Sequence, residues 1–108
     1  MAAQLHGTLD MIILRTLLRG AAHGHGITKL IQQTSADVLR VDHGSLYPAL
    51  HRLEKQGWIA SKWEDTERGR QMRFYHLTKA GKRQLQVEES NWHELAQAIA
   101  RILAPVEE

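Results

Sequence analysis

Side chains suited to binding nucleic acid are concentrated in residues 42–57, DHGSLYPALHRLEKQG. The apolar side chains of this segment recur at helical spacing and therefore share one face: Leu46, Ala49, Leu50 and Leu53. The opposite face carries Tyr47, His51 and Lys55, with Pro48 and Arg52 beside them. A helix anchored on one face, with aromatic, hydrogen-bonding and cationic groups on the other, suits the major groove of DNA. An ordinary amphipathic helix with a solvated face is the alternative.

The distribution of charge favours the same interpretation. Residues 40–83 hold ten lysines and arginines but five acids, a balance of +5, although the whole chain has a net charge of only +2. Residues 84–108 hold one arginine and five glutamates, a balance of −4. One region can therefore face a polyanion while the other cannot. No segment combines the basic residues with a broad apolar face, so nucleic acid is a better partner than a membrane surface.

Length and composition indicate one domain. A chain of 108 residues can bury one modest core but not two. The absence of cysteine excludes a disulfide scaffold and any thiolate metal site. No export signal is recognisable in residues 1–10, and the apolar run at 11–14 is far too short to cross a membrane. We therefore expect a cytoplasmic protein without a membrane contact.

The remaining sequence predicts the elements that position the helix within 42–57, in which Pro48 is expected to occupy the first turn, where no donor is needed. Before this helix, the patterns indicate a helix at 8–19, a flexible connection at 21–26 and a second helix from about 27 to 34, with an isolated strand at 38–41 as one possibility. After it, they indicate strands at 58–64 and 71–77 joined by a polar tip at 65–70. A last helix, capped by Thr78, follows. This order predicts a mainly α fold with a small β wing. The predicted architecture is a winged helix-turn-helix DNA-binding domain at 1–77, followed by a C-terminal dimerisation helix at 78–108.

An apolar stripe on the last helix indicates a homodimer. Residues with heptad-like spacing form this stripe: Leu85, Trp92, Leu95, Ile99 and Ile102. A helix of about 25 residues extends roughly 38 Å, which is longer than one small core can cover. A second copy of the chain is the simplest partner. The alternative is that the stripe folds back on its own winged helix.

Four segments resemble the PadR family of bacterial transcriptional regulators. They are GSLYPALHRLEKQGWI at 44–59, RFYHLTKAG at 73–81, GTLDMIILRTL at 7–17 and HGHGITKLI at 23–31. The single short C-terminal helix is similar to that of the family's smaller branch. The resemblance implies a homodimeric repressor that binds a pseudo-palindromic operator. It also implies that small aromatic, phenolic or lipophilic compounds can release the DNA.

Operator binding needs phosphate contacts for register and base-edge contacts for identity. We expect Tyr47, Pro48 and His51 to contact base edges, with Ser45 and Tyr47 equally able to donate to phosphate. The candidate phosphate ligands are Lys29, Arg52, Lys55, Arg68 and Arg70. The alternative for Arg52 and Lys55 is that they are solvated surface charges or pair with Glu54.

Two nearby features qualify this assignment. Arg73 is expected to pair with Glu64 across the hairpin, and Asp65 and Glu67 in the wing repel phosphate. A winged helix can also be a protein interaction module without specific DNA binding. That function would require apolar anchors on the outward face of the third helix.

Trp92 is the candidate effector-binding residue, with Ala96 beside it. An indole at a dimer interface can stack on a flat apolar ligand, but it can equally be plain interface core. Trp58 and Trp63 are expected to pack at the helix–strand corner and on the sheet face. The pair His23 and His25 lacks further ligands for a metal site. No nucleophile elbow or phosphate-binding loop indicates an enzyme, and no cofactor is expected.

Overall fold

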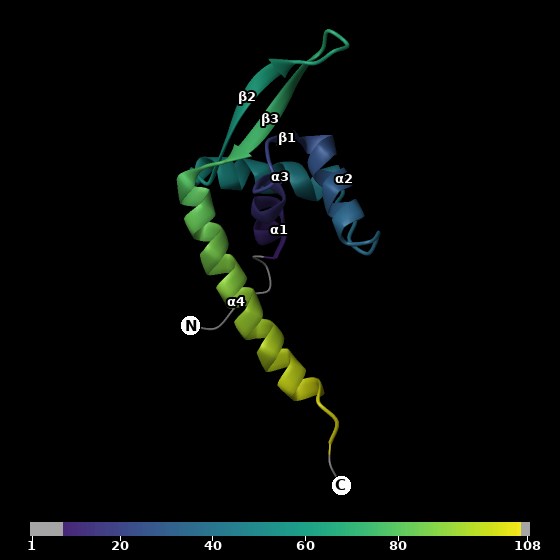
Figure 1. Cartoon of the computed structure of the whole chain (residues 1–108), viewed down its shortest axis with the longest axis vertical. Coiled ribbons are helices and arrows are strands. Elements are labelled where there is room, and N and C mark those ends of the chain that lie inside the picture. The colour runs from purple at the N-terminus through teal and green to yellow at the C-terminus, as the bar shows by residue number, and fades with distance from the viewer. Residues whose placement is uncertain (1–7, 107–108) are drawn as a thin grey trace.

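The computed structural model describes residues 8–106, which form a small helical body with a β wing and a projecting helix (Figure 1). The elements are α1 (Thr8–Leu17), β1 (Ala22–His23), α2 (Gly24–Thr34), α3 (His43–Lys55), β2 (Ile59–Asp65), β3 (Gln71–Leu77) and α4 (Lys79–Leu103). The strands form one antiparallel sheet in the order β1-β3-β2. This arrangement confirms the predicted winged helix-turn-helix with a long last helix. The export-signal prediction concerns residues 1–10, of which 1–7 lie outside the described residues.

The core lies between α1, α2, α3 and the base of the wing. Its members come from every helix and from all three strands: Ile13, Leu14, Leu17, Ala22, Ile27, Ile31, Leu46, Ala49, Leu50, Leu53, Ile59, Tyr75 and Leu85. The predicted apolar face of α3 is completely buried in it. Trp58 packs against the same core at the corner between α3 and β2, as expected.

Local signals set the two ends of α3. Asp42 is the N-cap, and its carboxylate accepts a hydrogen bond of 2.7 Å from the Ser45 N–H. Gly57 follows the helix with φ +78°, a conformation in which glycine is favoured. Pro48 lies in the second turn, so the prediction that it occupies the first turn was wrong. It has no N–H to donate to the Gly44 carbonyl, four residues earlier.

Two connections differ from the predictions. Residues 38–41 form an irregular connection and not a strand. The segment 21–26, expected to be a flexible connection, holds β1 and the first turn of α2. His23 caps α2 by accepting a hydrogen bond of 3.0 Å from the Gly26 N–H at Nδ1, and its ring packs edge-on against Phe74. A strand of two residues is too short to produce a periodic pattern.

A polar network attaches the wing to α3. Ser61 on β2 donates a hydrogen bond to the Glu54 carboxylate at the end of α3. Arg73 on β3 donates to Ser61 over 2.8 Å and to Glu54 over 2.9 Å. The predicted pairing of Arg73 with Glu64 was wrong, because Glu64 pairs with Lys62 on its own strand at 3.2 Å. In the strand register Arg73 lies opposite Trp63, and docking of α3 places the Glu54 carboxylate within reach of its guanidinium.

The start of α4 is fixed against the corner that follows α3. Thr78 caps the helix, accepting from the Gly81 N–H, and its hydroxyl donates to the Gly57 carbonyl over 2.7 Å. The Thr78 N–H donates to the Trp58 carbonyl over 3.1 Å. A Cβ atom at position 81 would collide with that same carbonyl oxygen. Glycine is therefore required where α4 crosses the chain between α3 and β2.

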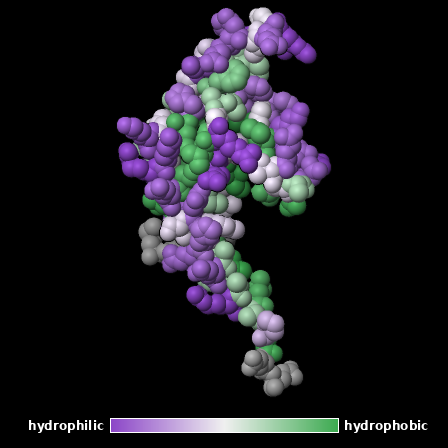
Figure 2. All heavy atoms as spheres, viewed as in Figure 1, coloured by the Kyte–Doolittle hydropathy of each residue, from purple (hydrophilic) through white to green (hydrophobic). Residues whose placement is uncertain are grey.

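After packing beside α1 along its first half, α4 leaves the body of the protomer. Figure 1 shows it running away from the wing, and the molecule measures 66 × 29 × 23 Å. Leu85 near its start is buried, but its C-terminal half bears exposed apolar residues: Trp92, Ile99, Ile102 and Leu103. Figure 2 shows hydrophobic surface, in green, along the projecting part of the helix. The protomer thus exposes a stripe that its own core does not cover.

We predict that the Glu54 network makes wing attachment sensitive to acid. The hydrogen bond from Ser61, reinforced by Arg73, lowers the pKa of Glu54 below its ordinary value of 4.5 despite partial burial. A lowered folded-state pKa contributes stability at pH above the ordinary value, and that stability is lost as pH falls through the folded-state pKa. The variant Glu54→Gln should therefore be about 1 kcal/mol less stable at neutral pH and lose less stability below about pH 4.5. Denaturant unfolding at several pH values measures both effects.

The matched control is Glu64→Gln, which removes a carboxylate whose ion pair with Lys62 is more exposed. Its unfolding free energy should follow the wild-type dependence on pH. Identical acid sensitivity in wild type and Glu54→Gln would show that this carboxylate does not gain from its neighbours.

Candidate nucleic-acid interface

The outward face of α3 presents the residues predicted to contact base edges. Ser45, Pro48 and His51 are exposed, and Tyr47 is 47% exposed. The Tyr47 ring packs edge-on against His43 with centroids 5.6 Å apart. These side chains occupy the N-terminal and central turns of α3, opposite its buried leucines. The arrangement leaves donors, acceptors and an apolar ring available to a groove.

Tyr47 also contacts the start of α2. Its hydroxyl and ring lie over Gly24, where an added Cβ atom would be too close. Gly24 is buried, so the helix–turn–helix packing depends on the absence of a side chain at this position. The contact orients the tyrosine although nearly half of its surface remains exposed. Sequence reasoning missed the role of Gly24, because the spacing of two residues on separate helices carries no local signal.

The basic residues of α3 point in different directions. Arg52 pairs with Asp10 on α1 at 2.8 Å, and not with Glu54, which was the alternative considered. Its side chain is still 55% exposed. Lys55 lies exposed in the last turn. Arg52 is thus held beside α1, whereas Lys55 lies at the end of the helix nearest the wing.

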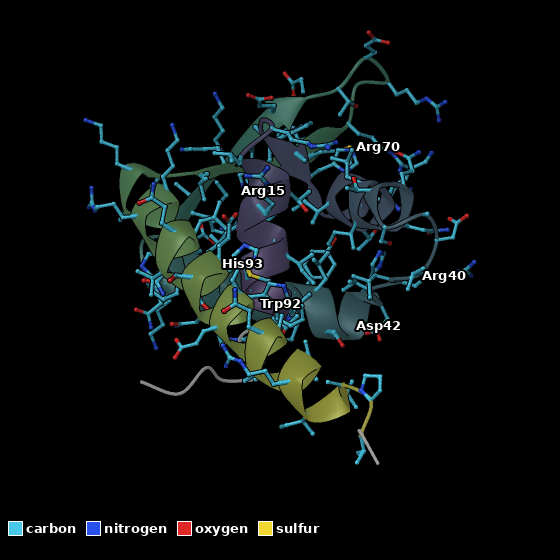
Figure 3. The ribbon with its side chains drawn as sticks, turned by 60° about the horizontal axis from the view of Figure 1, so that its bottom comes forward. Arg15, Arg40, Asp42, Arg70, Trp92 and His93 are labelled. Carbon is cyan, nitrogen blue, oxygen red and sulfur yellow. The ribbon has the colours of Figure 1, made fainter. Side chains whose placement is uncertain are left out.

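The wing tip displays two further arginines on an ordered turn. The Thr66 N–H donates to the Arg70 carbonyl over 2.7 Å, and the Gly69 N–H donates to the Thr66 carbonyl over 3.0 Å. Gly69 adopts φ +74°, which suits glycine in a tight turn. Arg68 and Arg70 are exposed, and Figure 3 shows Arg70 at the wing, apart from Trp92 on α4.

Charge near this tip is mixed. The acids Asp65 and Glu67 are also exposed there, and Lys29 is exposed on α2. The candidate contacts therefore lie on three separate elements: α2, α3 and the wing. Close insertion of the whole loop into a groove would bring two carboxylates near phosphate.

Trp63 is not where the sequence suggested. It lies on β2 with 63% of its surface exposed, so the expected packing on the sheet face was wrong. The alternating pattern identified the strand correctly, but the hairpin extends beyond the helices that cover its base.

The sequence also did not reveal the network of Glu54, Ser61 and Arg73. Tyr47, His51 and Glu54 are spaced by four and three residues, which places all three on one side of α3. This spacing could have indicated that Glu54 lies on the same side of the helix as the candidate base contacts.

A separate apolar cavity lies where α1, α2 and α4 meet, with a volume of about 340 Å³. It is lined by residues of α1, α2, the following connection and α4: Met11, Ile12, Arg15, Thr16, Ile31, Thr34, Ser35, Leu39, Glu89 and Trp92. Arg15 and Glu89 form a long ion pair of 3.7 Å beside it. Figure 3 shows Arg15 and Trp92 where α1 and α4 meet. Ala96 does not line the cavity.

Neither a metal-binding cluster nor a membrane-spanning helix occurs in the part of the chain that the structure describes. Residues 8–106 contain no group of three or more histidine, cysteine or acidic side chains able to hold a metal ion. His23, one of the two histidines considered, is a helix cap. Within the same residues, no helix combines enough length and apolar character to cross a membrane.

Known proteins resemble this chain in sequence and architecture. Transcriptional regulator Rv3488 of Mycobacterium tuberculosis is 36% identical over 87 residues, which cover 81% of this chain and 78% of that protein. A transcriptional regulator from Clostridium thermocellum superposes with a TM-score of 0.85 at 26% identity, covering 93% of this chain and 97% of the other. A PadR family transcriptional regulator from Eggerthella lenta gives 0.77 at 31% identity, covering 94% and 86%.

The family assignment rests on a match over most of the chain. Residues 13–87 match the Transcriptional regulator PadR-like family, from the middle of α1 into α4. The matched segment includes α3 and the whole wing, which carry all but one of the candidate DNA contacts; Lys29 on α2 falls within it as well. Regulators of this family are non-enzymatic proteins that bind DNA. The chain belongs to the PadR-like family of transcriptional regulators.

Proposed function

We propose that this protein is a homodimeric repressor that binds an inverted-repeat operator in the cytoplasm. The observation that carries the proposal is the exposed polar and cationic face of α3 beside a wing tip bearing two arginines. The unit at 1–77 would bind DNA, and the helix at 78–108 would dimerise. The single C-terminal helix fits the smaller branch of the family.

The proposed contacts divide by distance from the base edges. Tyr47, Pro48 and His51 read the major groove, where Pro48 offers only apolar contact, for example to a thymine methyl group. Ser45 and Lys55 reach phosphates on either side of this helix. The outer phosphates are contacted by Lys29 and by the wing residues Arg68 and Arg70. Arg52 contributes least, because Asp10 already neutralises its charge.

The dimer would be formed by the C-terminal half of α4. Ile102 is 80% exposed and Trp92 is 40% exposed in the single chain, and Leu95 and Ile99 lie between them on the same stripe. Leu85, which was included in the predicted interface, is only 4% exposed and offers little surface to a partner. A two-fold axis would place the two α3 helices about 34 Å apart, which is one turn of duplex.

Docking on another protein is the less favoured function. An interaction helix presents apolar anchors to its partner groove. The outward face of α3 instead exposes Ser45, His51 and Lys55. The ring of Tyr47 is its main apolar surface, and this ring is partly committed to His43 and Gly24.

The cavity beside Trp92 supports a regulatory ligand. Its walls are mainly apolar, which suits a small aromatic or lipophilic effector. We propose that Trp92 contacts this ligand, while Ala96, one turn further along α4, leaves space for it near a partner helix. To release DNA, the ligand must bind more tightly to a dimer geometry that separates the α3 helices differently, because equal affinity shifts nothing.

The operator-binding proposal predicts steep salt dependence. A dimer that neutralises six to ten phosphates should lose roughly 10³ to 10⁵ in affinity between about 50 and 200 mM salt. The double variant Arg68→Ala/Arg70→Ala should flatten that slope, since each dimer loses up to four contacts. Fluorescence anisotropy with a labelled duplex from the region upstream of its own coding sequence measures the slope, and a scrambled duplex reports specificity.

The matched control is Lys82→Ala/Arg83→Ala, which removes the same formal charge from the exposed start of α4. It should leave the slope close to that of the wild type. Equal slopes for wild type and the wing variant would remove the wing from the interface. Equal affinity for both duplexes would contradict a sequence-specific regulator.

The dimer proposal predicts twice the chain mass of 12.3 kDa at micromolar concentration. Ile99→Asp/Ile102→Asp should give the monomer mass, because burial of unpaired carboxylates costs several kcal/mol per ion. Ser90→Asp, on the opposite side of α4, should remain dimeric. Light scattering distinguishes these outcomes, and a monomeric wild type would disprove the proposed assembly.

The effector proposal predicts that a planar lipophilic dye quenches tryptophan emission and weakens operator binding together. In Trp92→Phe, which retains Trp58 and Trp63, the quenching should fall several-fold. Undiminished quenching in this variant would place the ligand elsewhere. If a panel of aromatic dyes and phenolic acids gives no quenching of the wild type, Trp92 is interface core alone.

A further inference from the structure

Trp63 occupies an unusual position for a large aromatic side chain. It is more exposed than Tyr47 or Trp92, and it lies on a strand directly opposite Arg73. Residues directly opposite each other in an antiparallel pair point to the same face. Arg73 on that face reaches the Glu54 carboxylate of α3. The Trp63 side chain therefore belongs to the face of the hairpin that is turned toward α3.

The distance between Trp63 and the helix contact can be followed along the strand. Ser61, two residues earlier on the same face, donates its hydroxyl to Glu54. Trp63 thus lies roughly 7 Å along β2 from Ser61, in the direction of the wing tip, and level with Arg73 on the neighbouring strand. It is the first large side chain of β2 on this face beyond Ser61.

The adjoining side of α3 is the proposed reading face. Glu54, His51 and Tyr47 are separated by three and four residues, so they follow one side of the helix. Since Glu54 contacts the hairpin, His51 and Tyr47 continue that side toward the N-terminus of α3. Together with Trp63 and Arg73 they form one surface, termed here the α3–wing surface. The Glu54 carboxylate, which borders this surface, is neutralised by Arg73.

The shape of duplex DNA indicates what crosses this surface. A helix in the major groove and a wing tip at the adjacent minor groove lie on either side of one sugar–phosphate strand. An indole has an apolar ring that can pack on deoxyribose and an N–H that can donate to phosphate. We infer that Trp63 contacts this strand, with its ring on a deoxyribose and its Nε1–H donating to a phosphate oxygen.

Charge near Trp63 is compatible with that contact. Arg68 and Arg70 attract phosphate at the tip, and Lys62 beside Trp63 balances Glu64 in an ion pair. Asp65 lies two residues beyond Trp63 on the same face and repels phosphate. Because Asp65 repels phosphate, the contact between this face and the DNA strand is limited to the inner part of the hairpin, at Trp63. The inference rests on the proposed DNA-binding function and adds a residue to it.

The test uses Trp63 as its own reporter. The variant Trp58→Phe/Trp92→Phe leaves Trp63 as the one tryptophan of the chain, which has three. Acrylamide should quench its emission strongly in the unbound protein. Addition of the upstream duplex, or of a scrambled duplex at low salt, should reduce the quenching constant several-fold, because a sugar–phosphate contact does not depend on base sequence. If this variant does not fold, the difference in quenching between wild type and Trp63→Phe supplies the same signal.

Affinity provides a second measurement. Trp63→Phe keeps a ring but loses the N–H, so the anisotropy titration should show roughly tenfold weaker binding to both duplexes, and Trp63→Ala should bind more weakly still. Val87→Ala on α4, a loss of exposed apolar surface away from the wing, is the control and should bind as the wild type does.

The outcomes separate this inference from the function on which it rests. Unchanged quenching of Trp63 while the labelled duplex is bound would refute the contact and leave DNA binding intact. Wild-type affinity in Trp63→Ala would refute it equally. If the wild type binds neither duplex, the proposed function fails and the contact fails with it.

Discussion

Burial of one face of α3 is the constraint on which the rest of the structure depends. Leu46, Ala49, Leu50 and Leu53 are each at most 1% exposed, and burial of a leucine side chain contributes roughly 1.5–3 kcal/mol. The helices α1 and α2 and the first residue of β2 supply the matching apolar surface. Because this face fixes the rotation of α3 about its own axis, the opposite face must point outward. The reading face is therefore a consequence of core packing, and its residues need few contacts of their own to be correctly oriented.

The orientation of α3 about its axis does not by itself determine where the wing lies. Polar interactions between the helix and the hairpin set that position. Glu54 extends from the edge of α3 and accepts hydrogen bonds from Ser61 and Arg73, one on each strand of the hairpin. A guanidinium can engage a carboxylate and a hydroxyl at once, which a lysine ammonium does with less geometric definition. The Arg73 side chain also lies over the Tyr75 ring, with 5.7 Å to the centroid. Burial raises the pKa of Tyr75, which therefore stays neutral beneath the arginine. The wing and the helix are thus joined by the hydrogen bonds of Glu54, next to the contact of Arg73 with the Tyr75 ring.

Sequence patterns predicted what depends on local periodicity and missed what depends on docking. The apolar spacing of α3, the alternation of β3 and the cap at Thr78 each involve residues close in the chain, and each was identified correctly. The partner of Arg73 was not, because the sequence suggested a cross-strand acid, whereas Trp63 is directly opposite Arg73 and the packing of α3 provides Glu54. β1 is two residues long, too short for any pattern, and it was recognised only through its pairing with Tyr75 and Phe74. Exposure of Trp63 follows from how far the hairpin extends past the helices, which no spacing encodes.

The close approach of Gly81 to the Trp58 carbonyl gives α4 the character of a rigid lever. With backbone against backbone and Thr78 bonded to Gly57, the joint has little space in which to bend. A helix of this length, about 38 Å, amplifies rotation: a tilt of roughly 10° at the joint moves its far end by about 7 Å. A displacement imposed on the distal half of α4 would act both on α1, which packs along the first half of the helix, and on the corner that carries the end of α3. A partner or ligand that moves the far end of this helix would thereby change the angle at which α3 is presented.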